Sequence, residues 1–160
     1  MNLYGLRTEH RKDPIGLSVK KPRFSWKIES EEKETMQESY HIIVKEAKAQ
    51  GADTNDTVWD SGVVRSSESV LIVYDGKELK PETRYNVAIE ITDNHGNTAK
   101  EQMTFETGIF DNQQFKAKMI THDFPEKETS CPVFEKEFET KPDIVSARIY
   151  ATAHGVYEIK

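Results

Sequence analysis

Apolar and polar residues alternate through most of the first hundred residues, with the period of two that is typical of strands. In "FSWKI", residues Phe24, Trp26 and Ile28 share one face, and "TAKEQMTFET" places Met103 and Phe105 on one face in the same way. The only stretch with a helix-like composition, "VKEAKAQ", is too short to stand alone. Seven strands are expected, near Gly16–Val19, Arg23–Ile28, Ser39–Glu46, Val58–Val64, Ser69–Val73, Thr83–Thr92 and Thr98–Thr107. The pattern therefore predicts an all-β domain.

Short strands with turn residues between them favour a sandwich of two antiparallel sheets. The stretch "LKPETRYNVAI" then predicts a tyrosine corner, in which the Tyr85 hydroxyl bonds to backbone a few residues upstream. In this reading Leu79 closes the end of the core and Pro81 stiffens the crossing between sheets. This stretch resembles the corner of fibronectin type III domains, and the resemblance implies that Trp26 is the core tryptophan, with Tyr40 as its neighbour.

After "ETG" at residues 106–108 the pattern changes. "VFEKEFETK" alternates, with Phe134 and Phe138 on one face, and "DIVSARIYATAHGVYEIK" predicts a hairpin that turns at His154-Gly155. The expected organisation is a sandwich over residues 1–108, followed over 109–160 by a linker and the incomplete start of a second domain. Since the chain stops inside an expected strand, we expect it to be part of a longer polypeptide.

The order of several motifs is more specific than the fold. "LRTEHRKDPIGLSVKKPRFSW" is followed by "MQESYHIIVKEA", "WDSGVV", "YDGKEL", "FETGIF" and "ARIYATAHGVYEI". This series resembles the N-terminal region of bacterial α-L-rhamnosidases of glycoside hydrolase family 78. The resemblance implies a fibronectin type III-like (immunoglobulin-like) β-sandwich over 1–108 and the first strands of a truncated, carbohydrate-binding-like jelly-roll domain over 109–160.

The same resemblance implies that the full-length parent hydrolyses terminal α-L-rhamnosyl residues with inversion, in a downstream helical barrel. Inversion needs two carboxyl groups about 6.5–9.5 Å apart. These groups belong to the barrel, so the resemblance assigns no catalytic residue to this chain. We expect the 160-residue chain to be an inactive accessory fragment. Its expected partners are the barrel of the same polypeptide and, through the parent, rhamnosides; no substrate-binding residue is assigned.

Composition narrows the function further. The net charge of −6 argues against nucleic-acid binding, which needs clustered Lys and Arg. No apolar run is long enough to span a membrane, and the start "MNLYGLRTEHRKD" turns polar before a signal peptide can form. Cys131 is the only cysteine, so no internal disulfide can form. A cytoplasmic location is the simplest expectation.

Few residues suggest chemistry of their own. The carboxylates of "ESEEKE" (29–34) are expected in a solvated loop, Cys131 as a small buried apolar residue, and the sequon Asn55-Asp56-Thr57 as a polar turn. No cofactor or metal is expected, because the five histidines lack ligand spacing. These histidines are His10, His41, His95, His122 and His154.

The residues leave open both the role of several aromatic side chains and the function of the chain. Four aromatic residues could form a sugar-stacking surface or seal the edges of domains: Tyr4, Tyr74, Phe110 and Phe124. A free-standing type III-like adhesion or glycan-binding module is accordingly the alternative to the accessory role, with an enzyme complete in 160 residues as a more remote one. Unpaired strands within 111–160 also predict pairing with a second copy or folding back on the first domain.

Overall fold

The computed structural model describes residues 1–48, 53–123, 125 and 131–159. The chain divides into two units, Met1–Gln114 and Phe115–Lys160. The boundary at residue 108 that the sequence suggests stays a prediction, although the last strand of the first unit ends close to it, at Glu106.

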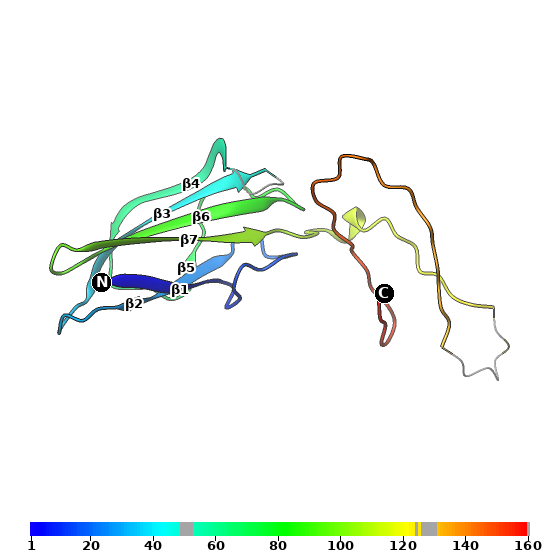
Figure 1. Ribbon diagram of the computed structural model, residues 1–160, viewed down its shortest axis with the longest axis horizontal. Helices are drawn as coiled ribbons and strands as arrows, with labels where there is room; N and C mark the ends of the chain where they lie inside the picture. The colour runs from blue at the N-terminus through cyan, green and yellow to red at the C-terminus, as the bar shows by residue number, and fades with distance from the viewer. Residues whose placement is uncertain (49–52, 124, 126–130, 160) are drawn as a thin grey trace. The chain divides into compact units, whose positions relative to one another are not determined.

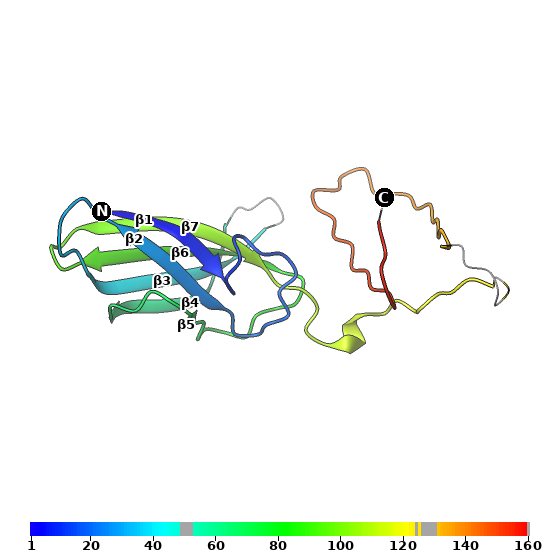
Figure 2. The ribbon, with the colours of Figure 1, turned by 90° about the horizontal axis from the view of Figure 1, so that it is seen from below.

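The first unit is a sandwich of two sheets, stacked in Figure 1 and seen from below in Figure 2. Its elements are β1 (Asn2–Thr8), β2 (Arg23–Glu29), β3 (Gln37–Ala47), β4 (Asp53–Arg65), β5 (Ile72–Val73), β6 (Arg84–Asp93), β7 (Thr98–Glu106) and the 3-10 turn η1 (Asn112–Gln114). One sheet has the order β1-β2-β5 and the other β4-β3-β6-β7, with antiparallel pairing throughout. The predicted all-β, immunoglobulin-like sandwich is confirmed.

The core is filled by the alternating residues of the facing strands. Phe24 and Trp26 on β2 point toward Ile42 and Val44 on β3, and all four are at most 2% exposed. Met103 and Phe105 on β7 are buried as predicted. Full burial of one such side chain contributes about 1.5–3 kcal/mol to stability. Burial of the apolar residues at alternate positions is therefore the main driving force for the sandwich.

The first strand was predicted in the wrong place. Residues 2–8 form β1, whereas the expected strand at Gly16–Val19 is reduced to a single parallel bridge between Leu17 and Thr107. The reason is a bulge in β1, where Gly5 has φ +64° and the register with β2 shifts. The bulge adds a residue, so Leu3 and Leu6 both face the core although they are three positions apart. Simple alternation is lost there.

Strand β4, at the edge of the four-stranded sheet, is longer and more irregular than expected. Ser61-Gly62 does not break it but forms one of three register irregularities against β3. Gly62 takes φ +60°, a left-handed conformation that glycine adopts without strain. The sequon Asn55-Asp56-Thr57 lies within this strand, so its prediction as a turn was wrong. The expected strand at Ser69–Val73 shortens to two residues, Ile72–Val73.

The second unit contains no strand among residues 115–123, 125 and 131–159. The strands expected in "VFEKEFETK" and in the final hairpin are therefore not formed, although the chain bends at His154-Gly155. Phe134, Phe138 and Ile149 remain exposed, without the partner strands that a stable sheet requires. The assignment of this region to the start of a jelly-roll domain stays a prediction.

Candidate functional site

The tyrosine corner is present at the start of β6. Tyr85 is fully buried, and its hydroxyl oxygen accepts a hydrogen bond from the Lys80 backbone N–H at 2.8 Å. The ring stacks on Phe105 at 5.1 Å between centroids, and Leu79 is buried as predicted. Burial raises the pKa of Tyr85, since the charged form would lose its hydration. The predicted structural role of Tyr85 is confirmed.

Trp26 links the two sheets through a buried amide. Its indole N–H donates to Gln37 Oε1 at 2.8 Å, and Tyr40 packs edge-on against its ring as predicted. Gln37 Nε2 donates in turn to the carbonyls of Ser66 and Glu68, at 2.8 and 2.9 Å. Gln37 therefore joins β2, β3 and the loop after β4, and each of its polar atoms has a partner inside the sandwich. Sequence reasoning identified Trp26 and missed this amide.

A second buried tyrosine organises the loop after β5. The Tyr74 hydroxyl donates to the Lys77 carbonyl at 2.6 Å, and its ring meets Trp59 edge-on at 5.3 Å. Burial raises the pKa of Tyr74 to about 12. The backbone of Gly76 lies so close that an added Cβ would fall 2.4 Å from the Val58 carbonyl oxygen. The "YDGKEL" motif is thus a packing motif.

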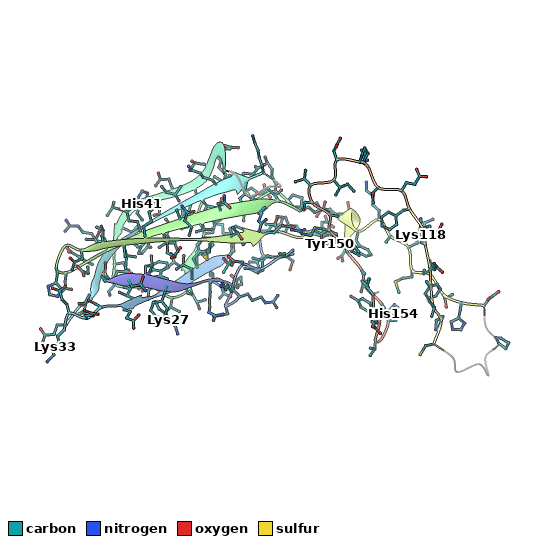
Figure 3. The ribbon with its side chains drawn as sticks, viewed as in Figure 1. Lys27, Lys33, His41, Lys118, Tyr150 and His154 are labelled. Atoms are coloured by element: carbon teal, nitrogen blue, oxygen red, sulfur yellow. The ribbon has the colours of Figure 1, made fainter. Side chains whose placement is uncertain are left out.

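A histidine–carboxylate pair lies across β3 and β4 on the outer face of the four-stranded sheet. His41 Nε2 is 2.6 Å from Asp60 Oδ1, and Figure 3 shows His41 on this sheet. The Gly62 backbone N–H, followed by His41, lowers the pKa of Asp60. The neighbouring Ser61 hydroxyl accepts from the Ile42 N–H and donates to the Gly62 carbonyl, at 2.8 and 2.7 Å. This hydroxyl is committed to the bulge, so "WDSG" serves to shape β4.

Two other polar groups stabilise turns. Glu9 forms a two-pronged ion pair with Arg23, at 3.0 and 2.6 Å, and the Arg23 side chain lowers the pKa of Glu9. The buried Asp93 accepts from the backbone N–H groups of His95 and Asn97 at the β6–β7 turn. Burial raises the pKa of Asp93, but the Asn97 and His95 donors outweigh it and the net pKa is lowered.

The remaining candidate residues do not converge. The carboxylates of Glu31, Glu32 and Glu34 lie in an exposed loop, as expected, whereas Glu29 is the exposed last residue of β2. Lys33 marks the tip of this loop in Figure 3. Cys131 is exposed, which contradicts the predicted burial, because no sheet forms around it. Over the described ranges 1–48, 53–123, 125 and 131–159, no three His, Cys, Asp or Glu side chains are grouped to hold a metal ion.

The aromatic residues proposed as a sugar platform are scattered. Tyr4 is exposed on β1, Tyr74 is a core residue, and Phe110 packs partly against the core. Phe124 lies outside the described residues. One open hollow is lined by four consecutive residues, Lys136–Glu139, and hence by a single stretch of chain. Among the helices of the described chain, none has the length and apolar character of a membrane span.

Several α-L-rhamnosidases match nearly the whole chain in sequence. An α-L-rhamnosidase of Formosa agariphila is 31% identical over 95% of this chain and 18% of its own length. An α-L-rhamnosidase of Streptomyces avermitilis is 30% identical over 94% of this chain and 17% of its own length. The chain thus spans less than a fifth of these relatives.

Solved structures agree with this match. The α-L-rhamnosidase of Streptomyces avermitilis, complexed with L-rhamnose, is 34% identical with a TM-score of 0.65, over 73% of this chain and 11% of that one. The α-L-rhamnosidase of Dictyoglumus thermophilum is 35% identical with a TM-score of 0.64, over 72% and 13%. Residues 3–111 match the profile described as "Rha78A-like, N-terminal immunoglobulin domain". The chain accordingly belongs to the family of Rha78A-like N-terminal immunoglobulin domains and is homologous to the N-terminal region of α-L-rhamnosidases.

Proposed function

We propose that this chain is the non-catalytic N-terminal accessory region of an α-L-rhamnosidase. The observation that carries the proposal is the match over 92–95% of the chain but only 17–18% of the relatives' length. In the parent, the reaction would be the inverting hydrolysis of terminal α-L-rhamnosyl residues, performed by a downstream barrel. The sandwich would act as a support that packs against the rest of the polypeptide.

The polar groups of the sandwich support this role. Tyr85, Gln37 and Ser61 direct their side chains to backbone or side-chain partners within the sandwich. Each of these bonds fixes the arrangement of strands or loops. The described contacts are those of a module built to keep its shape.

A domain exchange tests the proposal directly. The matching N-terminal part of the Streptomyces avermitilis enzyme is replaced by residues 1–160 of this chain, and hydrolysis of an aryl α-L-rhamnoside is measured. We expect the chimera to retain rhamnosidase activity, whereas the 160-residue chain alone shows none. Deletion of the same N-terminal part is the control and is expected to give an unstable enzyme. Hydrolysis by the isolated chain would contradict the accessory role.

The glycan-binding alternative predicts a different result. Calorimetric titration of the chain with L-rhamnose and with a rhamnoside is expected to show no heat of binding. The burial of Tyr74 supports this expectation, since a sugar-stacking platform needs exposed rings. Saturable binding heat would instead favour a glycan-binding module.

The proposal also includes self-association of the isolated chain. Apolar residues of the second unit, among them Phe138 and Ile149, are exposed, which supports pairing of residues 111–160 with a second copy when the rest of the polypeptide is missing. Light scattering at increasing concentration is expected to show a monomer–dimer equilibrium that disappears when residues 115–160 are removed.

A cytoplasmic location of the parent is proposed as well, and cell fractionation tests it.

A further inference from the structure

The chain leaves the sandwich through the segment Glu106–Gly108, which is hydrogen-bonded on both sides. On one side it meets the loop of residues 14–17. Glu106 N–H donates to the Pro14 carbonyl at 2.9 Å, Leu17 N–H donates to the Glu106 carbonyl at 3.0 Å, and Gly108 N–H donates to the Leu17 carbonyl at 2.7 Å. A Cβ on Gly108 would approach the Gly16 carbonyl to 2.9 Å, so only glycine allows this contact.

On its other side the same segment meets the tyrosine corner. The buried Thr107 hydroxyl donates to the Lys80 carbonyl at 2.7 Å and accepts from the Thr83 N–H at 2.9 Å. Two backbone bonds reinforce it, from Thr107 N–H to the Thr83 carbonyl and from Glu82 N–H to the Gly108 carbonyl. Lys80 is thereby shared, because its N–H donates to Tyr85 and its carbonyl accepts from Thr107.

Order continues beyond the last strand. Phe110 packs against the core, and its N–H donates to Gln114 Oε1 at 2.9 Å. The Asp111 N–H donates to the same oxygen at 3.1 Å, and Asp111 accepts from Gln113 N–H at the start of η1. Residues 110–114 are therefore tied back to one another and belong to the sandwich unit, which ends at Gln114.

We propose that Thr107 is a latch that fixes the outgoing chain to the tyrosine corner, so that the sandwich remains rigid through Gln114 and motion of the following unit begins at Phe115. The Thr107 hydroxyl satisfies two backbone groups, the Lys80 carbonyl and the Thr83 N–H, which would otherwise be left to water. A module held in this way presents its outgoing chain in one fixed direction to whatever follows.

The test uses amide hydrogen exchange and ¹⁵N relaxation on the full 160-residue chain. Thr107→Val keeps the shape of the side chain and removes the hydroxyl. We expect the Thr83 amide to exchange roughly tenfold faster or more, which is the effect of about one lost hydrogen bond. The amides of Val44 and Ile89 in the centre of the sheet are expected to keep their rates.

Two variants serve as controls. Thr107→Ser retains the hydroxyl and is expected to keep the wild-type rate at Thr83. Thr104→Val makes the same chemical change three residues earlier on β7 and is expected to leave Thr83 unaffected.

In the wild type, backbone order is expected to fall only after Gln114, and in Thr107→Val from Glu106 onward. An unchanged Thr83 rate in Thr107→Val, or an equal acceleration of every amide, would overturn the latch. A loss of order already at Thr107 in the wild type would overturn it independently, even if the valine variant did not fold.

Discussion

Gly76 offers a sharp test of how tightly the loop after β5 is packed. Its φ is not in the left-handed region, so the reason for glycine is space alone. A Cβ there would lie 2.4 Å from the Val58 carbonyl oxygen, 2.5 Å from Trp59 Cβ and 2.6 Å from the Tyr74 hydroxyl. None of these three neighbours is the end of a flexible side chain. Gly76→Ala must therefore displace backbone or the buried phenol.

The magnitude follows from two costs. Overpacking of a tight site typically costs about 1–3 kcal/mol, and three contacts this short place Gly76→Ala at the upper end. Moving the Tyr74 hydroxyl also weakens its 2.6 Å bond to the Lys77 carbonyl, which adds about 1 kcal/mol. We expect the free energy of unfolding to fall by about 3–4 kcal/mol.

Urea denaturation followed by tryptophan fluorescence measures this, because Trp59 lies beside the affected loop. With a slope of about 2 kcal/mol per molar urea, the midpoint is expected to fall by roughly 1.5–2 M. Gly62→Ala is the matched control. Gly62 has φ +60° but no atom within 4 Å of the added Cβ, so only backbone strain of about 1–2 kcal/mol applies. If Gly76→Ala unfolded at the wild-type midpoint, the packing explanation would be refuted.

Three further expectations concern other buried contacts and are checked by the same denaturation experiment. Tyr85→Phe removes the acceptor of the part-buried Lys80 backbone N–H and is expected to cost about 0.5–1.5 kcal/mol; an unchanged urea midpoint would contradict the corner. Trp26→Ala is expected to cost about 3–5 kcal/mol, because it empties a core site and deprives Gln37 of its donor. Folding lowers the pKa of Asp93 from 3.8 and the pKa of Glu9 from 4.5. Each ionised carboxylate therefore stabilises the fold fully at a pH above its unfolded pKa. This stabilisation is lost as the pH falls through the lower pKa of the folded state. The urea midpoint is expected to hold between pH 8 and 5 and to decline below about pH 4, less steeply in Asp93→Asn; an equal decline in that variant would contradict the role of the carboxylate.

The parts of the fold that sequence predicted are those in which neighbouring residues carry the signal. Alternation over β2, β3, β6 and β7 placed Trp26, Phe105 and the other inward residues correctly. The corner residues Leu79 and Tyr85 were found because their spacing is local. Strand β1 escaped prediction since a bulge at Gly5 shifts its inward residues from alternate positions to a spacing of three.

Contacts between distant segments could not be predicted in this way. The His41–Asp60 pair depends on the register between β3 and β4, which three irregularities shift. The roles of Gly76 and Thr107 depend on which backbone lies opposite, and no local pattern encodes that. The strands expected beyond residue 115 are not formed in the described residues, because an alternating sequence forms no stable strand without a partner to pair with.

The irregular β4 edge has a consequence for how the sandwich behaves at high concentration. An incoming polypeptide adds to a sheet only where a straight row of N–H and C=O groups is offered to it. The bulges of β4, including the one at Ser61-Gly62, interrupt that row and twist it. The β4 edge of the four-stranded sheet is thereby protected against amyloid-like stacking. Aggregation of this protein, where it occurs, is then expected to start from the exposed apolar residues near its carboxyl end.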